Sequence, residues 1–492
     1  MLGMLERIDE IRREIGQRTS RTHKSELGQF LTPAPVARFM ASLFPSSNQD
    51  KAFLLDAGAG VGSLAGAFLD RCLAGGFGFT SVDVTACEID EALHPFLEQA
   101  LADYANRLNM TSRLVSSDFI EHAVNTLQFA NGPRFTHAIL NPPYRKIQGR
   151  SRHRLLLRQV GIETVNLYSA FVALAVSLME EGGLLVAILP RSFCNGPYYR
   201  PFREYVLART AVRHLHLFAS RNRAFREDAV LQENVIVLLE RGGVQGAVTV
   251  STSTDDRFAD YAADDHPFAR IVHPGDGERV IHVPTADTEG IAEFSPAFRH
   301  SLEDIGVEVS TGPVVDFRLK EHLRDSQEAG GVPLLYPGHL VGGAVEWPSS
   351  RVKKPDALAL NTVTEKWLYP NGFYAVVRRL SSKEEMRRVV ASVVTPSSFD
   401  ASFLGFENHL NVFHKGKHGL PEDLARGLAV YLNATIVDDC FRRFSGHTQV
   451  NAADLRRMKY PSRDALMEMG RWAAAQGTLE QGQIDRKVGS LE

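Results

Sequence analysis

Residues 52–64 read Ala-Phe-Leu-Leu-Asp-Ala-Gly-Ala-Gly-Val-Gly-Ser-Leu: an apolar strand, a glycine-rich turn and the start of a helix. Gly58, Gly60 and Gly62 allow a tight turn and a close approach of the backbone to a ligand. Such a turn lies over the carboxyl end of its strand, where open α/β sheets bind nucleotide-like ligands. Asp56 would repel a phosphate, but it suits the positively charged aminopropyl end of a sulfonium cofactor. A glycine-rich turn alone is weak evidence of such a ligand.

The segments around this turn alternate between strand-like and helix-like patterns, which predicts an open, mostly parallel α/β sheet. Residues 167–180 are apolar nearly all round, and they predict a buried crossover helix that Gly182 and Gly183 end. We expect a Rossmann-like domain with seven strands, at residues 52–56, 82–88, 113–116, 135–140, 184–189, 212–218 and 234–240.

The composition changes after the last of these strands. Residues 241–300 are rich in Gly, Asp, Ala, Thr and Pro, and from residue 301 the pattern becomes α+β, with a late helix near residues 420–433. The chain is therefore expected to comprise three parts: an α/β domain, an irregular connecting region and an α+β domain, at residues 1–245, 246–300 and 301–492.

Asn141-Pro-Pro-Tyr144 follows the strand at residues 135–140 directly. Two consecutive prolines fix φ and remove two backbone donors, so Asn141 and the Pro142 carbonyl are held rigidly as hydrogen-bond acceptors. Tyr144 adds an aromatic face beside them. This combination suits binding of an amino group on a planar substrate whose nitrogen is to be methylated, although a plain turn at a strand end is the alternative.

Acidic residues end two further strands. Glu88 is placed to accept both hydroxyl groups of a ribose, and Asp118 to accept from an adenine amino group on whose ring Phe119 packs. A surface acid at a strand end is the simpler interpretation of each acid taken alone. Near the N-terminus, Thr32-Pro33 has the features of a helix cap.

Charge is unevenly distributed although the formal net charge is only −3. Residues 145–158 contain no acid and follow the Asn-Pro-Pro-Tyr segment, so they are expected to attract a polyanion; a solvated loop is the alternative. The basic residues of this segment are Arg145, Lys146, Arg150, Arg152, Arg154 and Arg158.

The composition argues against several classes of protein. The four cysteines show neither CxxC nor Cys/His spacing, so neither a disulfide framework nor a metal site is expected. The N-terminus does not resemble a signal peptide, and no apolar run reaches the length of a membrane span. We expect a cytoplasmic protein that does not bind membranes.

Five motifs in this order resemble the gamma class of S-adenosylmethionine-dependent N6-adenine DNA methyltransferases, the modification enzymes of restriction–modification systems. The motifs are GQFLTP, DAGAGVGSL, ACEID, SSDF and NPPY, and the resemblance covers the α/β half of the chain. It implies a cofactor site formed by Thr32, Pro33, Asp56, Gly58, Gly60, Glu88, Asp118 and Phe119. Thr32 and Pro33 would pack on the methionine part of the cofactor.

The same resemblance implies that Asn141, Pro142 and Tyr144 bind a target adenine flipped out of double-stranded DNA. A second aromatic residue is expected on the other face of this base, with Phe225 as the candidate and Phe218 as the alternative. Arg145 and Lys146 are expected to contact DNA, and Arg442 and Arg443 to bind its phosphates. For Asn451 and Asp454, capping of a helix is at least as good an explanation as DNA contact.

The expected enzyme is thus a monomeric DNA methyltransferase with a target-recognition domain after residue 301 and a separate restriction endonuclease as its companion. Methylation of a protein glutamine is one alternative, because a primary amide poses the same geometric problem as an adenine amino group. Methylation of RNA adenine and a non-catalytic DNA-binding protein are the others.

Overall fold

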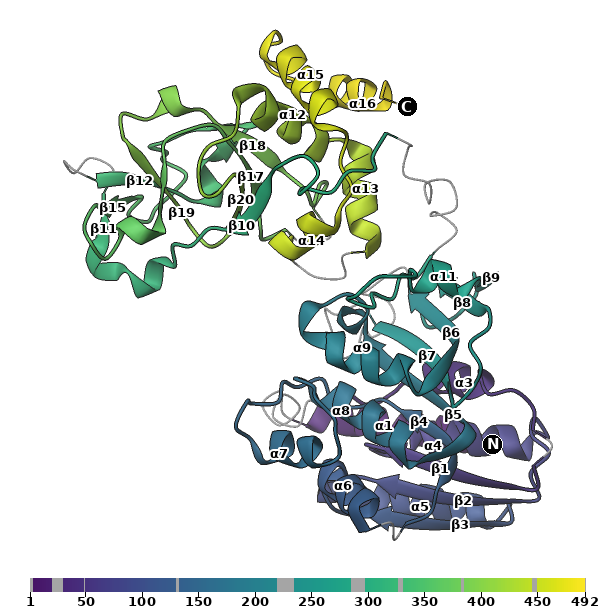
Figure 1. Ribbon diagram of the computed structural model, residues 1–492. Coiled ribbons are helices and arrows are strands. Elements are labelled where there is room, and N and C mark those ends of the chain that lie inside the picture. Colours follow the sequence, from purple (N-terminus) through teal and green to yellow (C-terminus); the bar gives the residue numbers. More distant parts are fainter. Residues whose placement is uncertain are drawn as a thin grey trace. The chain divides into compact units, whose positions relative to one another are not determined.

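The computed structural model describes residues 3–19, 30–47, 49–129, 132–218, 234–284, 297–325, 331–381, 385–444 and 449–491. The chain divides into two compact units, Met1–Thr285 (unit 1) and Ala286–Glu492 (unit 2) (Figure 1). Each unit encloses hydrophobic cores of its own, so each is a folding unit in its own right.

A nine-stranded sheet with the order β3-β2-β1-β4-β5-β7-β6-β8-β9 forms the centre of unit 1. β1 to β5 pair in parallel with one another, whereas β7 is antiparallel to β5 and β6. The strands are β1 (Lys51–Ala57), β2 (Ser81–Cys87), β3 (Met110–Val115), β4 (Phe135–Leu140), β5 (Met179–Pro190), β6 (Thr210–Phe218), β7 (Asn234–Arg241), β8 (Val248–Ser253) and β9 (Ala262–His266). The first seven correspond to the predicted strands, which confirms the Rossmann-like α/β fold.

Helices cover both faces of this sheet (Figure 1). β4 shows why both faces need cover, because Ile139 packs into the core on one face while Ala138 and Leu140 pack into the core on the other. The first core includes α1 (Met4–Arg18), α3 (Ala34–Ser42), α4 (Ser63–Leu73) and α5 (His94–Ala105). The second includes α6 (Phe119–Phe129), α7 (Arg152–Gln159), α8 (Leu167–Leu178), α9 (Arg200–Leu207) and the short α11 (Phe268–Ile271). α8 is the predicted crossover helix, but it ends at Leu178, where β5 begins, rather than at Gly182.

The prediction of an irregular connection over residues 246–300 is wrong for its first part. β8 pairs in parallel with β6, and β9 pairs antiparallel with β8, so the sheet of unit 1 extends beyond the seventh strand. Polar residues are buried in β8 because Ser251 bonds to His214 and His216 of β6, at 2.7 and 2.8 Å. Burial lowers the pKa of these histidines to about 4 and about 3, so both are neutral.

Unit 2 has the α+β composition expected from the sequence. Its sheets have the orders β10-β20-β17-β18-β14-β13 and β11-β15-β12-β19-β16. The strands are β10 (Glu308–Thr311), β11 (Leu323–Arg324), β12 (Gly331–Leu335), β13 (Leu340–Val341), β14 (Ala344–Val345), β15 (Ala357–Ala359), β16 (Leu368–Pro370), β17 (Tyr374–Arg378), β18 (Ala391–Val394), β19 (Phe403–Phe406) and β20 (Leu410–His414).

The helices of unit 2 follow its strands in the chain. They are α12 (Glu422–Leu432), α13 (Thr435–Phe444), α14 (Ala452–Arg457), α15 (Arg463–Ala474) and α16 (Gln481–Gly489). α12 is the predicted late helix, and it packs against β17, β18 and α15. Its contact with α15 is close at Gly427, where an added Cβ would lie 1.8 Å from the carbonyl oxygen of Leu466.

Candidate active site

The glycine-rich turn and the Asn-Pro-Pro-Tyr segment lie side by side at the carboxyl edge of the sheet. β1 and β4 are parallel neighbours with Asp56 opposite Ile139, so the turns that follow the two strands meet. An added Cβ on Gly58 would lie 3.8 Å from the carbonyl oxygen of Asn141. This is the crevice in which open α/β sheets bind ligands.

The glycine-rich turn has the conformation that its sequence predicts. Gly58, Gly60 and Gly62 all have positive φ, at +83°, +58° and +87°. Side chains at these positions would be strained, because residues with a Cβ rarely adopt this conformation. The backbone nitrogens of Gly58 and Ala59 both donate to the carbonyl oxygen of Cys87 at 2.9 Å, which ties the turn to the end of β2.

Asp56 lies behind this turn and is fully buried. Its Oδ2 accepts from the backbone nitrogen of Ala65 at 3.0 Å, near the start of α4. Its Oδ1 is buried with no hydrogen-bond partner within the part of the chain that the structure describes. Burial, together with the nearby charge of Glu88 and against the bond from Ala65, raises the pKa of Asp56 to about 7.

Glu88 follows β2 directly and is nearly buried. One carboxylate oxygen accepts from the backbone nitrogen of Gly60 at 2.7 Å, and the other accepts from the backbone nitrogen of Asp90 at 2.8 Å. Burial raises the pKa of Glu88 although both backbone bonds oppose this shift. Each oxygen can accept a second hydrogen bond, so the carboxylate can still bind hydroxyl groups of a ligand.

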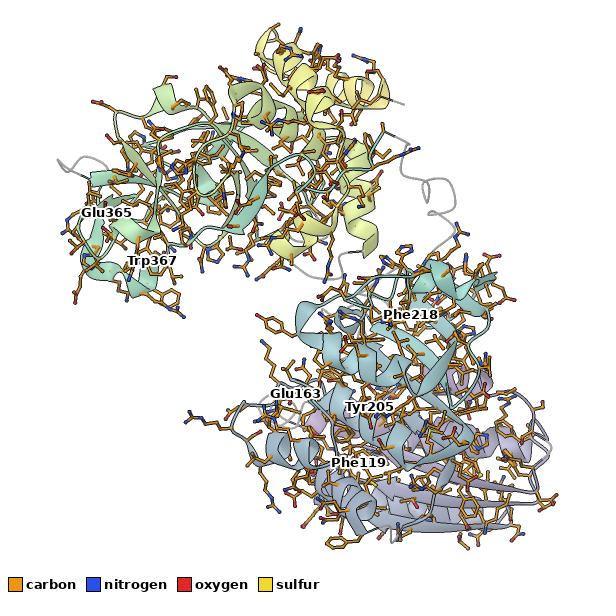
Figure 2. All side chains as sticks on the ribbon, viewed as in Figure 1. Phe119, Glu163, Tyr205, Phe218, Glu365 and Trp367 are labelled. Atoms are coloured by element: carbon orange, nitrogen blue, oxygen red, sulfur yellow. The ribbon has the colours of Figure 1, made fainter. Side chains whose placement is uncertain are left out.

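Asp118 and Phe119 stand at the start of α6 (Figure 2). Asp118 Oδ1 accepts from the backbone nitrogen of Glu121 at 3.1 Å, and its Oδ2 lies 3.0 Å from Nε2 of His153. Burial disfavours the charge of Asp118, but the bond to His153 holds its pKa below the ordinary value. The same bond raises the pKa of His153 against the effect of burial, so it favours a protonated imidazole beside the carboxylate.

The side-chain amide of Asn141 has a defined orientation. Its Nδ2 donates to the carbonyl oxygen of Phe30 at 2.8 Å and to Oγ1 of Thr32 at 2.9 Å. A backbone carbonyl can only accept, so the amide atom facing Phe30 is the nitrogen. Its Oδ1 faces the opposite way and accepts from the Tyr144 hydroxyl at 3.3 Å.

Pro142 is buried, and Tyr144 is half-buried and contacts two aromatic rings. Its ring centroid lies 5.6 Å from that of Phe30 and 6.1 Å from that of Tyr168. The Tyr144 hydroxyl also lies 3.3 Å from the carbonyl oxygen of Ile188 on β5, and burial raises its pKa. These contacts hold the turn against the strand beside it.

Thr32 is buried and does not cap α3, whose N-cap is Pro33. The hydroxyl of Thr32 instead contacts Asn141, which is 109 positions away in the sequence. Beside it, the Leu31 side chain packs so close to Gly60 that a Cβ there would lie 2.6 Å from it. The N-terminal segment thus lies between the two turns.

A cavity of about 200 Å³ joins these parts. It includes seven of the predicted site residues, Gly58, Gly60, Glu88, Asp118, Phe119, Asn141 and Arg145. Phe30, Leu31, Cys87, Ile89, Ser117, Pro143, His153, Leu167 and Phe171 complete its lining. The other predicted site residues of unit 1 that the structure describes are not among the lining residues: Thr32, Pro33, Asp56, Pro142, Tyr144 and Lys146. Asp56 bonds to the backbone of α4, and Thr32 bonds to the side chain of Asn141.

His153, Phe30 and Phe171 line the cavity but were not predicted from the sequence. His153 lies within the basic segment, which was interpreted only by the positive charge of its arginines. Phe171 is one apolar residue of a helix that is apolar nearly all round, so periodicity did not distinguish it. Only Phe30 carried a usable signal, because it precedes the Leu-Thr-Pro of a motif that the sequence already singled out.

The basic segment is more strongly ion-paired than its sequence indicates. Arg152 pairs with Glu121 at 2.9 Å, and both Arg154 and Arg158 pair with Glu163. Glu163, labelled in Figure 2, follows the segment in the chain. Arg145 and Lys146 are exposed, as contact with DNA would require.

The candidates for the second aromatic residue have different outcomes. The alternative that Phe218 stacks on the base is wrong, because Phe218 is buried at the end of β6. Its ring centroid lies 4.8 Å from that of His216 and 5.8 Å from that of Phe258. It is a core residue of unit 1 (Figure 2). Phe225 lies outside the residues that the structure describes.

The two arginines expected to bind phosphate lie on α13. Arg442 donates from Nε to Asp438 at 2.6 Å and from Nη2 to the carbonyl oxygen of Glu385 at 2.7 Å. It thus joins α13 to the backbone at Glu385. The side chain of Arg443 lies outside the described part of the chain. Asn451 and Asp454 form a capping box at the start of α14, as the capping interpretation predicts.

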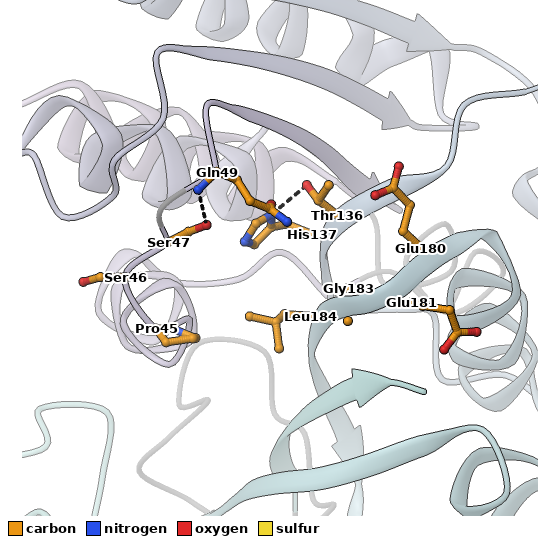
Figure 3. A pocket seen from close by; sticks show the side chains of 11 residues that line it. Pro45, Ser46, Ser47, Gln49, Thr136, His137, Glu180, Glu181, Gly183 and Leu184 are labelled. Atoms are coloured by element: carbon orange, nitrogen blue, oxygen red, sulfur yellow. Dashed lines mark hydrogen bonds between the residues drawn. The ribbon is translucent and has the colours of Figure 1, made fainter. Parts of the chain in front are cut away.

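A second, smaller cavity of about 100 Å³ lies at the opposite edge of the sheet (Figure 3). Thr136 and His137, at the beginning of β4, line it and bond to each other at 2.8 Å. None of the predicted site residues that the structure describes lines this cavity. Within the described residues, no group of three or more His, Cys, Asp or Glu side chains is arranged to hold a metal ion. None of the described helices is long and apolar enough to span a membrane.

The residues around the larger cavity fit the groups of S-adenosylmethionine. The ribose hydroxyls, the adenine amino group and the ammonium group of this cofactor are all hydrogen-bond donors. The site offers matching acceptors in the carboxylates of Glu88 and Asp118, and the buried Oδ1 of Asp56 behind the turn still has no partner among the described residues. Phe119 and Phe171 supply apolar surface for a planar ring.

Comparison with known proteins gives concordant matches. Residues 89–225 match the family model of the Eco57I restriction-modification methylase. The chain is 50% identical to the type II methyltransferase M.BsuBI of Bacillus subtilis, over 100% of this chain and 98% of that protein. It is 42% identical to the type II methyltransferase M.PstI of Providencia stuartii, over 98% of this chain and 96% of that protein.

Among solved structures, the chain resembles the DrdV–DNA complex with a TM-score of 0.54 and 11% identity, over 95% of this chain and 59% of that one. This likeness concerns the fold alone. Identity along the full length of two curated relatives settles the family: the chain belongs to the type II DNA methyltransferases of restriction–modification systems.

Proposed function

We propose that this protein transfers a methyl group from S-adenosylmethionine to N6 of an adenine in double-stranded DNA and so protects its target site from a separate restriction endonuclease. The observation that carries the proposal is the fixed amide of Asn141 at the edge of a cavity that also contains the glycine-rich turn and Glu88. The N6-adenine specificity rests on the Asn-Pro-Pro-Tyr segment and its surroundings.

The cofactor half of the site binds and orients S-adenosylmethionine. Glu88 accepts hydrogen bonds from the ribose hydroxyls. Asp118 accepts a hydrogen bond from the adenine amino group of the cofactor, and Phe119 packs on the adenine ring. Gly58 and Gly60 have positive φ, which favours glycine, and the turn therefore has no side chains at these positions on the side of the ligand. When bound, S-adenosylmethionine supplies a methyl group on a positively charged sulfur, which makes the carbon electrophilic.

The target half binds the amino group to be methylated. A base inside a duplex cannot reach the cavity edge, so the adenine is extruded from the helix, at a cost of about a few kcal/mol. Stacking on Tyr144 offsets this cost by roughly 1–3 kcal/mol. We place Phe225 on the other face of the base.

Asn141 Oδ1 and the Pro142 carbonyl oxygen then accept hydrogen bonds from N6. No donor within the described residues contacts this carbonyl, and the Tyr144 hydroxyl takes only one acceptor site of Asn141 Oδ1. Two acceptors draw the nitrogen from its planar state and stabilise the positive charge that develops during transfer. A titrating general base is not required at position 141, because the nitrogen becomes strongly acidic once it carries the methyl group and then releases its proton to water.

Unit 2 is proposed to select the DNA sequence. Arginine and amide side chains read base edges in the major groove, and lysines bind phosphates. Arg351, Lys353 and Lys415 are exposed there. Arg351 lies 3.8 Å from Glu346, and Lys354 is paired with Asp316 at 2.7 Å. Arg145 and Lys146 of unit 1 are proposed to contact the DNA next to the extruded base.

Transfer of a tritiated methyl group tests this proposal. The protein is incubated with labelled S-adenosylmethionine and, in parallel, with mixed-sequence duplex DNA, RNA and a glutamine-containing peptide. Label is expected on duplex DNA alone. Label on RNA or on the peptide would support the alternative acceptors, and DNA binding without any label would support a non-catalytic role.

Substitution of Asn141 tests the catalytic assignment. Asn141→Ala is expected to slow transfer by a factor of about 10²–10³ or more, the size of effect seen when one hydrogen bond to a developing charge is removed. DNA binding should be retained. Asn109→Ala is the matched control, because Asn109 bonds to the carbonyl oxygen of Thr80, before β2 starts and away from the carboxyl edge. Full activity of the Asn141 variant would contradict the assignment.

A further inference from the structure

The Asn141 amide is held from behind by the N-terminal segment. Both hydrogens of its nitrogen are used, one by the carbonyl oxygen of Phe30 at 2.8 Å and one by Oγ1 of Thr32 at 2.9 Å. An amide offers two donors on nitrogen and acceptor sites on oxygen, so the bond to the Phe30 carbonyl, which can only accept, fixes which end faces the substrate. The bond to Thr32 holds the amide in that position.

The orientation matters because the two ends of an amide have opposite hydrogen-bonding character. With Oδ1 toward the substrate, Asn141 accepts from an amino group. With the amide rotated by half a turn, its own NH₂ group would face the amino group, and two donors would oppose each other. The rotated amide would also place its oxygen against the Phe30 carbonyl, which is an acceptor and cannot donate.

Thr32 is itself firmly placed. Pro33 follows it and restricts it to an extended backbone, in which a β-branched residue is well accommodated. The backbone nitrogen of Ala34 donates to Asp9 at 3.1 Å, and Asp9 pairs with Arg12 at 2.7 Å inside α1. The segment is thus anchored by a buried ion pair on a different helix.

We propose that Thr32 is a positioning residue for methyl transfer, whose hydroxyl oxygen holds the Asn141 amide with Oδ1 toward the amino group of the target. The proposal rests on the proposed function. It assigns to Thr32 a bond behind the catalytic amide in place of the contact with the cofactor that the sequence resemblance implies.

Thr32→Val removes the acceptor and keeps the shape of the side chain. The single-turnover rate of methyl transfer onto DNA is expected to fall roughly tenfold, which corresponds to about 1.4 kcal/mol, because one of two bonds that orient the amide is lost. The Kd for S-adenosylmethionine and the KM for DNA are expected to stay within about twofold of the wild type, since Thr32 is buried and does not line the cavity. Thr32→Ser restores the acceptor and is expected to restore most of the rate.

Thr136→Val is the matched control. Thr136 is also buried, and its hydroxyl accepts from the backbone nitrogen of Phe53 at 2.9 Å, at the opposite end of β4 from Asn141. This variant loses that bond and the hydroxyl's bonds to His137 and to the Phe53 carbonyl oxygen, and it is still expected to keep the transfer rate. Circular dichroism verifies folding, and Thr32→Ala removes the same acceptor if the valine variant does not fold.

Three results would overturn the inference: a wild-type rate in both Thr32→Val and Thr32→Ala, a loss of rate in Thr32→Ser equal to that in Thr32→Val, or a weaker Kd for the cofactor at an unchanged rate. Failure of the proposed function gives a different pattern, because the wild-type protein itself would then transfer no methyl group to DNA.

Discussion

The buried carboxyl group of Asp56 predicts a specific dependence of stability on pH. Burial raises its pKa from an ordinary value of 3.8 to about 7. The folded protein therefore binds one proton more than the unfolded chain between about pH 4 and pH 7. The free energy of unfolding falls as the pH rises through this window, because the carboxyl group must then lose its proton in a fully buried site.

The difference between the two pKa values sets the size of the effect. One pKa unit corresponds to about 1.4 kcal/mol, so a difference of about 3 gives up to about 4 kcal/mol between pH 4 and pH 8. The bond from the backbone nitrogen of Ala65 to Oδ2 opposes this cost and does not remove it, since Oδ1 has no partner among the described residues.

Asp56→Asn removes the titration and keeps an oxygen that accepts from Ala65. The variant is expected to be more stable than the wild type at pH 8, and this advantage should shrink toward pH 5. Urea unfolding followed by circular dichroism reports on both units, whereas tryptophan fluorescence reports on unit 2, because Trp347, Trp367 and Trp472 all lie there. The pH-dependent difference should appear in circular dichroism alone.

A matched control is Glu98→Gln on α5, which removes an exposed carboxylate from the same unit. Its unfolding curve should follow that of the wild type within about 0.5 kcal/mol at both pH values. The reasoning is refuted if the difference between Asp56→Asn and the wild type is the same at pH 5 and pH 8.

Two further predictions concern one residue in each unit. Glu88→Ala is expected to weaken binding of S-adenosylmethionine by about tenfold or more in isothermal titration, because the ribose hydroxyls lose their acceptor; an unchanged Kd would contradict the cofactor assignment. Gly427→Ala is expected to lower the tryptophan-detected unfolding midpoint of unit 2, because the added Cβ would lie 1.8 Å from the Leu466 carbonyl oxygen. Gly477→Ala is its control, because nothing lies within 4 Å of that Cβ, and equal midpoints for the two variants would refute the packing argument.

The strands of unit 1 and the position of its site followed from local patterns in the sequence. Short apolar runs that end in Gly, Pro or an acid identify parallel strands and the edge at which they stop. Because the carboxyl ends of parallel strands meet, Asp56, Glu88 and Asn141 could be placed at one edge before any coordinates were known. The cavity joins the turns that follow these strands.

Partners that come from distant segments could not be predicted in this way. The bond between Thr32 and Asn141 joins residues that four strands, β1 to β4, separate in the sequence, and no local pattern encodes it. The arginines of residues 145–158 suggested a free polycation because their acidic partners, Glu121 and Glu163, lie outside that segment. His153 was not predicted as a cavity residue for the same reason, since its position depends on a bond to Asp118, which also lies outside the segment.

The extension of the sheet was missed for a different reason. Residues 248–253 alternate in a strand-like manner, but the Gly-, Asp- and Thr-rich composition around them indicated an irregular region. Their burial depends on His214 and His216, which accommodate Ser251 inside the sheet. Composition averages over both faces of a strand, and it therefore cannot reveal such a pairing.

Identification of the methylated nucleoside tests the central claim most directly. Duplex DNA is incubated with the protein and S-adenosylmethionine, digested to nucleosides and analysed by mass spectrometry, with the Asn141→Ala variant in parallel. The account predicts N6-methyladenine as the product of the wild-type protein and little or none from the variant. Methylcytosine as the product, or N6-methyladenine in equal amounts from both proteins, would contradict it.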